Sequence, residues 1–114
     1  METTIEQESK QSFSLDGDLT AVTAQEIRIQ LKDLIRHGLR ELVIDLSNTR
    51  VIDSTGIGLL VATHNSLRRI DAKLTLINVS QELFELLKAF RLDKHFSITG
   101  DPRLTVSARR ESNA

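Results

Sequence analysis

The sequence predicts an α/β domain with a mostly parallel β-sheet of about four or five strands and three or four helices. Two aliphatic runs, residues 41–46 and 73–78, have the length and composition of buried strands. Segments in which apolar residues recur at helical spacing lie before, between and after these runs. The order strand, helix, strand, helix, strand favours parallel pairing through right-handed crossovers, with the helices packed on the sheet.

The first elements are a short strand and an amphipathic helix. Residues 12–15 alternate polar and apolar side chains, as in a half-buried strand, and residues 16–18 form a turn. Thr23 and Glu26 have the spacing of a capping box, which predicts a helix over residues 24–37. One face of that helix is apolar and is expected to pack on the core: Ile27, Leu31, Leu34 and Ile35.

The middle of the chain predicts a buried strand followed by a second helix. Residues 41–46 suit a strand covered on both faces, and residues 47–53 a loop. The helix runs from Ser54 or Thr55 to about Ile70. Ile57 and Val61 fall outside its expected core face, so they either contact the sheet or extend an exposed surface. The expected core face consists of Leu59, Ala62, Thr63, Ser66, Leu67 and Ile70.

The last elements are a strand at residues 73–78, a third helix and one more strand at residues 96–98. Ser80 is a plausible N-cap of the third helix. The inner face of this helix is expected to consist of Leu83, Phe84, Leu87 and Phe90. We expect one domain over residues 1–114, with a core at about 11–98 and a polar tail at 99–114. Residues 1–10 are expected to be a weak edge strand or a frayed end.

The composition narrows the possible functions. The chain has 114 residues, 39% apolar and 27% charged, with a net charge of −1, and it has no cysteine. Disulfides and thiolate chemistry are therefore excluded, and no feature indicates a nucleic-acid partner. No apolar stretch reaches the roughly 20 residues that span a membrane, and the polar N-terminal segment does not resemble a secretory signal. We therefore expect a cytoplasmic protein with no membrane insertion.

The chemically informative segment is residues 51–58, which bring an acid, two hydroxyls and two glycines to the start of a helix. Free backbone amides at a helix N-terminus attract negative charge, so a serine there is a good place to hold a phosphate. The same residues are also ordinary N-cap chemistry, worth about 1 kcal/mol and needing no function. Glycines in a first helical turn cost roughly 1 kcal/mol each against alanine, which favours a functional interpretation.

This segment resembles the signature of STAS domains, in particular the bacterial anti-sigma-factor antagonists. The resemblance runs through Asp45 and Leu46 into residues 52–58, and it includes residues 15–19, 23–24 and 74–78. It spans about residues 13–98 and implies a STAS-like fold. It also implies a partner-binding surface made of Asp53, Ser54, Thr55, Gly56, Ile57 and Gly58.

The resemblance implies a specific role for several of these residues. Ser54 corresponds to the serine that an anti-sigma factor with serine kinase activity phosphorylates, and Thr55 is the second choice. Asp53 corresponds to the acidic residue that supports recognition of the serine, and Gly56 would keep the first turn open to the partner. Where antagonists often carry an aspartate after the preceding turn, this chain has Thr20.

By this resemblance the chain binds the anti-sigma factor when unphosphorylated, which regulates transcription, and a PP2C-type phosphatase resets it. At a helix N-terminus a phosphate is expected to block the partner and not to unfold the domain. The alternative is an unphosphorylated STAS subunit of a larger assembly, such as a lipid-transport ABC complex or a chemosensory array.

Catalysis is not expected, and neither is a cofactor or a metal. A small hydrolase is a third and weaker interpretation, because no nucleophile-elbow motif is present. No phosphate-binding loop motif is present either. The three histidines, His37, His64 and His95, are scattered along the sequence without metal-ligand spacing.

Overall fold

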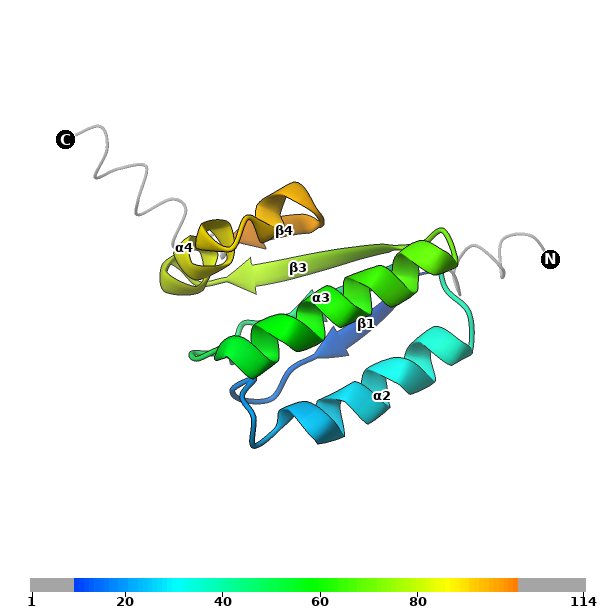
Figure 1. Ribbon diagram of the computed structural model, residues 1–114, viewed down its shortest axis with the longest axis horizontal. Coiled ribbons are helices and arrows are strands. Elements are labelled where there is room, and N and C mark those ends of the chain that lie inside the picture. The colour runs from blue at the N-terminus through cyan, green and yellow to red at the C-terminus, as the bar shows by residue number, and fades with distance from the viewer. Residues whose placement is uncertain (1–9, 101–114) are drawn as a thin grey trace.

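A computed structural model describes residues 10–100, which form four parallel strands connected by helices. The α/β class is as predicted, and Figure 1 shows the arrangement. The strands lie in sequence order and are parallel throughout. In chain order the elements are β1 Lys10–Ser14, α2 Ala24–Arg36, β2 Glu41–Asp45, α3 Ser54–Arg69, β3 Lys73–Val79, α4 Gln81–Ala89, the short 3-10 helix η1 Leu92–Lys94 and β4 Ser97–Gly100.

Helices α2 and α3 lie side by side on one face of the sheet (Figure 1). Leu42 and Ile44 of β2 point to this face and are almost fully buried. Leu83 and Leu87 of α4 belong to the same core cluster. Val43, on the opposite face of β2, is also buried. Because the strands are parallel, their carboxyl ends meet at one edge of the sheet, and the loops that precede α2 and α3 start there.

Thr23 is the N-cap residue of α2 as predicted, but the side-chain cap expected from the capping box is absent. Thr23 has helical backbone angles and its side chain caps no amide of α2. Its hydroxyl donates to the carbonyl of Asp18 at 2.8 Å and accepts from the N–H of Thr20 at 3.0 Å. The side chain therefore closes the loop before α2 instead of capping the helix.

Other differences concern helix faces and strand ends. Phe90 and Ile70 were predicted to belong to the core, and this prediction is wrong. They follow the last residues of α4 and α3 and are 52% and 46% exposed. Ala62 is exposed as well. Ile57, whose position was open, is buried. Strand β4 extends to Gly100, two residues into the expected tail, while the expectations for residues 1–9 and 101–114 lie outside the described residues.

Candidate functional site

Two loops at the carboxyl ends of β1 and β2 are joined by hydrogen bonds. The N–H of Leu19 donates to the carbonyl of Val51 at 3.0 Å, and the N–H of Asp53 donates to the carbonyl of Leu19 at 3.2 Å. The carboxylate of Asp18 accepts from the backbone N–H groups of Arg50 and Val51, both at 3.0 Å. These bonds fix the loop before α2 against the loop before α3, so the two loops form one surface.

Asp53 is the N-cap of α3 and also the link between this helix and the loop before α2. One carboxylate oxygen accepts from the N–H of Gly56 at 2.9 Å, and the other accepts from the N–H of Ala21 at 3.0 Å. These two N–H donors, of which Gly56 has the larger effect, hold the pKa of the Asp53 carboxyl below its usual range. Asp53 therefore stays negatively charged and fixed in position at neutral pH.

Ser54 and Thr55 occupy the first turn of α3, and both are exposed. Within residues 10–100 the Ser54 hydroxyl has no hydrogen-bond partner. The side chain that caps the helix is that of Asp53. The Ser54 hydroxyl is thus accessible and is not needed to hold the helix start. The structure therefore separates the two roles that the sequence left combined, capping by Asp53 and an accessible hydroxyl on Ser54.

Gly56 and Ile57, which the sequence placed in the partner-binding surface, are both buried. A Cβ on Gly56 would collide with the carbonyl oxygen of Leu19 and would lie 2.9 Å from Cγ2 of Ile52. The space beside Gly56 is therefore filled by the crossing loop and is not open to a partner. Gly58 differs, since a Cβ there would meet nothing within 4 Å.

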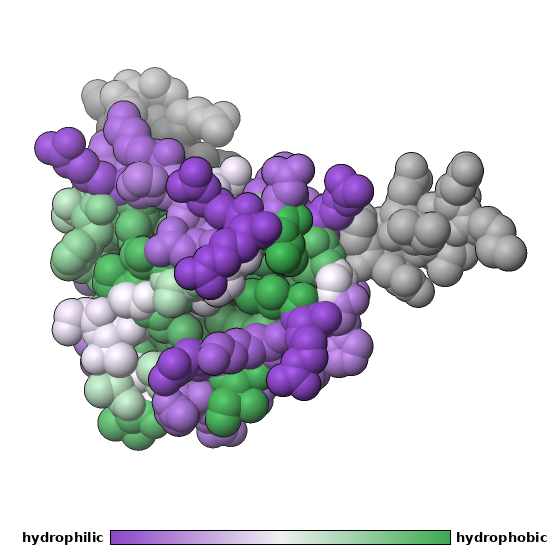
Figure 2. All heavy atoms as spheres, turned by 45° about the vertical axis from the view of Figure 1, so that its right-hand side comes forward, coloured by the Kyte–Doolittle hydropathy of each residue, from purple (hydrophilic) through white to green (hydrophobic). Residues whose placement is uncertain are grey.

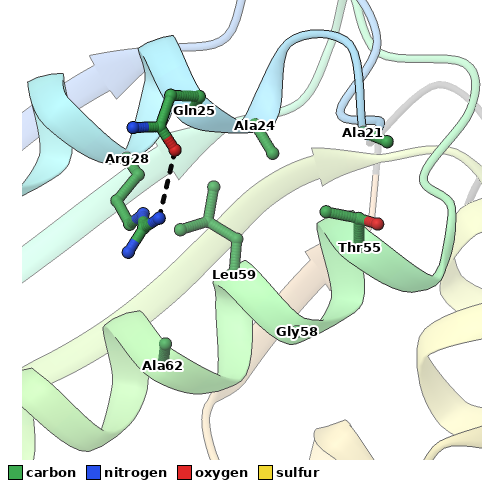
Figure 3. Close-up of a pocket in the computed structure, with 8 residues that line it drawn as sticks. All are labelled: Ala21, Ala24, Gln25, Arg28, Thr55, Gly58, Leu59 and Ala62. Atoms are coloured by element: carbon green, nitrogen blue, oxygen red, sulfur yellow. Dashed lines mark hydrogen bonds between the residues drawn. The ribbon is translucent and has the colours of Figure 1, made fainter.

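A shallow groove of about 290 Å³ runs between α2 and α3, and Thr55, the residue after Ser54, lines it (Figure 3). Arg28 and Gln25 extend from α2 toward α3 and are joined by a hydrogen bond of 3.1 Å. Small residues line much of the rest. The complete lining is Ala21, Ala24, Gln25, Arg28, Thr55, Gly58, Leu59 and Ala62.

Sequence reasoning missed the loop residues that flank the groove. Val22 is 91% exposed, the largest exposure among the large apolar side chains described. The neighbouring Thr20 holds this turn, because its hydroxyl accepts from the N–H of Val22 at 3.3 Å. Ile29 and Val51 are also at least half exposed. Apolar side chains interleaved with charged ones are visible on the face shown in Figure 2. An exposed valine in a polar loop was the one sequence signal that could have indicated this surface.

The sequence indicated three scattered histidines, but two of them lie close together in the structure. The rings of His64 and His95 lie 5.9 Å apart between centroids, at the far end of α3 from Ser54. Among the described residues, however, no group of three histidine, aspartate or glutamate side chains could hold a metal ion. No helix in residues 10–100 combines the length and the hydrophobicity needed to cross a bilayer.

The STAS domain family model matches residues 4–108. The chain belongs to the STAS domain family. The curated relatives of this STAS domain include the anti-sigma-B factor antagonist of Staphylococcus aureus strain NCTC 8325. That protein is 30% identical over 97 residues, which cover 85% of this chain and 82% of the relative.

Solved structures share the fold of this STAS domain at low identity. A Thermotoga maritima protein described as a candidate anti-sigma factor antagonist has a TM-score of 0.72 at 19% identity, with 87% of each chain covered. A sulfate transporter family protein of Wolinella succinogenes has a TM-score of 0.69 at 18% identity, covering 90% of this chain and 85% of its own.

SpoIIAA, an anti-sigma factor antagonist and Bacillus cell-fate determinant, has been solved in two states. The unphosphorylated form has a TM-score of 0.65 at 15% identity, covering 90% of this chain and 91% of its own. The phosphorylated form has a TM-score of 0.64 at 16% identity, covering 89% and 92%. This STAS domain therefore has the same fold as both forms.

Proposed function

We propose that this STAS domain is a partner-switching protein that binds an anti-sigma factor while Ser54 is unmodified and releases it when Ser54 is phosphorylated. The partner is a serine kinase that phosphorylates Ser54, and a PP2C-type phosphatase removes the phosphate. The switch regulates transcription and operates in the cytoplasm. The names of the relatives support the general role, and the phosphorylated form of SpoIIAA shows that a protein of this fold accepts such a modification.

The observation that carries the proposal is the position of Ser54. Its hydroxyl is exposed, has no partner among residues 10–100 and lies beside a carboxylate that is held in place by Gly56 and Ala21. A phosphoryl group adds about −1.5 to −2 charges. On this surface it would stand next to the fixed charge of Asp53. A partner fitted to a neutral hydroxyl would then meet a concentrated negative charge.

The surroundings of Ser54 explain why such a change would act on binding and not on folding. The phosphate would point to solvent at a helix N-terminus, where negative charge is favourable. The loops on either side are joined by hydrogen bonds that do not involve Ser54. Val22 and the groove between α2 and α3 supply apolar contact area for the partner. Thr55 lines that groove and is the second choice for the modified residue.

Catalysis by Ser54 is not part of the proposal. His64 is ten residues farther along α3, or about 15 Å at the rise of an α-helix. A histidine base must lie within hydrogen-bond reach of the serine it activates. Within the described residues, no hydrogen bond joins Ser54 to a histidine. We therefore assign Ser54 to recognition.

The test compares binding of three variants to the anti-sigma factor encoded in the same genome. Ser54→Ala should bind as the unmodified chain does, and Ser54→Asp should bind at least about tenfold more weakly because of the added charge. Asn65→Asp adds the same charge on an exposed position of the same helix, and it should leave binding unchanged. Circular dichroism should be the same for all variants. Equal binding by Ser54→Asp and the unmodified chain, or unfolding of Ser54→Asp, would contradict the proposal.

The modification itself is tested by phosphopeptide mass spectrometry of the protein from its native cell during growth and stress. A phosphate on Ser54 whose occupancy changes supports the switch.

The second candidate function is an unphosphorylated subunit of a larger assembly, favoured by the fold shared with a sulfate transporter family protein. No phosphate in any condition, together with stable co-purification in a membrane or array complex, would favour that candidate.

A further inference from the structure

A second concave surface lies at the opposite end of α3 from Ser54, where β3 and β4 begin. It encloses about 460 Å³ and is larger than the groove between α2 and α3. We call it the basic basin. Its walls come from the last turns of α3, the start of β3, η1 and the start of β4. The residues that line it are His64, Arg68, Ala72, Lys73, Leu74, Asp93, Lys94, His95, Phe96 and Ser97.

Positive charge dominates the basic basin. Arg68, Lys73 and Lys94 line it, and Asp93 is the only carboxylate in the lining. Within residues 10–100 none of these three cations is in an ion pair. Arg68 is in the last turn of α3, where a cation is favourable against the helix dipole. That reason does not extend to Lys73, which lies on a strand, so helix stability does not explain the whole cluster.

The two histidines add to this charge when they are protonated. The His64 ring packs against His95 and Phe96, with ring centroids 5.9 Å and 5.4 Å away. Nδ1 of His64 is buried and has no hydrogen-bond partner among the described residues. Burial lowers the pKa of His64, and the charges of Arg68 and His95 lower it further. Among the described residues, three cationic and two protonatable side chains thus line the basin with a single carboxylate, Asp93, to balance them.

We propose that the basic basin binds a tetrahedral dianion of the phosphate class, either free phosphate or the phosphoryl group of a small monoester. Arg68, Lys73 and Lys94 would supply charge-assisted donors to the oxygens of the anion. A dianion held among them neutralises the mutual repulsion of the basin side chains. Asp93 opposes binding, and its place in the lining makes the proposal sharply testable. The site is independent of Ser54 and of the proposed function.

The affinity for the dianion should increase when His64 gains a proton, which occurs below pH 6.5 because its pKa is lowered from that value. The groups that face the bound anion are His64 and Arg68 from α3, Lys73 from β3, Asp93 and Lys94 from η1, and His95, which follows η1. Protonation of His64 adds positive charge to the basin, whereas phosphate itself changes from dianion to monoanion on acidification, so affinities are compared per dianion. Bound phosphate should in turn raise the pKa of His64, because binding and protonation are linked.

The experiment is an NMR titration of the full chain with inorganic phosphate, followed on the imidazole resonances of His64 and His95, with sodium chloride at equal ionic strength as reference. Phosphate should give saturable shifts that chloride does not reproduce, and the pKa of His64 should rise. Arg68→Gln and Lys73→Gln should each weaken phosphate binding about tenfold. Arg69→Gln removes an exposed charge next to the basin without touching its lining, and it should bind as the unmodified chain does.

Asp93→Asn provides a gain that loss of structure cannot imitate. It should tighten phosphate binding several-fold, because it removes the one repulsive charge from the lining. A parallel titration with glycerol phosphate decides between the two forms of the ligand. Tighter binding of glycerol phosphate assigns the site to a monoester, and tighter binding of inorganic phosphate assigns it to the free ion. The proposal is overturned if the phosphate shifts do not saturate, if chloride reproduces them, or if Arg69→Gln weakens binding as much as Arg68→Gln.

Discussion

Gly56 and Gly58 are two residues apart in α3, yet they have different physical reasons for being glycine. A side chain on Gly56 would collide with the Leu19 carbonyl and with Ile52, and a backbone carbonyl cannot rotate away as a side chain can. A side chain on Gly58 would meet open space. The first glycine therefore allows the crossing loop to pack against the helix, whereas the second lowers helix stability for no packing gain.

We expect Gly56→Ala to lower the free energy of unfolding by about 1–3 kcal/mol or more, as overpacking does. Gly58→Ala should raise it by about 0.5–1 kcal/mol through helix propensity. Urea unfolding followed by circular dichroism measures both variants under the same conditions. A Gly56→Ala protein as stable as the unmodified chain would show that the loop of Leu19 can move away, and the packing argument would then fail.

The site could be predicted from the sequence only where its contacts are local. Asp53 directly precedes the helix and accepts from the N–H three residues later, and an acid in that position indicates an N-cap. The bond from Ala21 to Asp53, by contrast, joins residues separated by 32 positions. No local pattern indicates such a contact, so the sequence could not predict that Gly56 packs on a crossing loop or that Val22 lies beside the site.

At the scale of elements, Ser80 and Thr23 show how similar sequence signals lead to different structures. Ser80 has an extended backbone, and its hydroxyl accepts from the N–H of Leu83 at 3.2 Å, so it caps α4 as predicted. Thr23 has a helical backbone, and its hydroxyl bonds to Asp18 and Thr20 instead. The Thr23 hydroxyl closes the loop before α2, so it is not available to cap the helix.

Ser80→Ala should therefore lower the free energy of unfolding by about 1 kcal/mol. Ser80→Asp should retain most of the stability, because a carboxylate at the N-cap accepts the same bond and suits the helix dipole. Thermal or urea unfolding measures both variants. The assignment of Ser80 as the cap is contradicted if alanine and aspartate at this position are equally stable.

The existence and order of the elements followed from apolar periodicity, whereas their ends depended on other interactions. The positions of α3 and β3 match the prediction within a residue or so, because long periodic segments specify their own structure. Phe90 and Ile70 continue the apolar period of their helices but lie just past the last helical turn, where the chain leaves the core. A periodic pattern predicts a face, and it does not predict where the helix stops covering the sheet.

On the scale of the whole molecule, α3 connects two surfaces of opposite charge character. Its first turn carries the fixed carboxylate of Asp53 and the free hydroxyl of Ser54, and its last turns line the basic basin. His64 and His95 are 31 positions apart in the sequence and meet only because α3 and η1 pack at the same end of the sheet. That convergence depends on topology, which is why spacing alone could not indicate it.

The shifted pKa values predict how global stability depends on pH. The folded state lowers the pKa of His64 from 6.5, so below that pH the unfolded chain binds more protons and stability falls as the pH decreases. Asn78 and the backbone of Ser47 lower the pKa of Asp45 from 3.8, and Asp53 is shifted in the same direction by Gly56 and Ala21. Their contribution is present above 3.8 and is lost as the pH falls through the folded values. We therefore expect two successive losses of stability on acidification.

Urea unfolding between pH 8 and pH 3 separates the two steps. His64→Gln should remove the first loss, because the half-buried titrating imidazole is gone, and it should leave the second unchanged. His37→Gln is the matched control, since the His37 side chain is 74% exposed, follows the last residue of α2 and does not line the basic basin. The assignment would be wrong if the loss below pH 6.5 persisted in His64→Gln or vanished in His37→Gln. Because His64 lines the basic basin, phosphate at constant ionic strength should reduce the first loss in the unmodified chain, and the same phosphate concentration should reduce it less in Arg68→Gln.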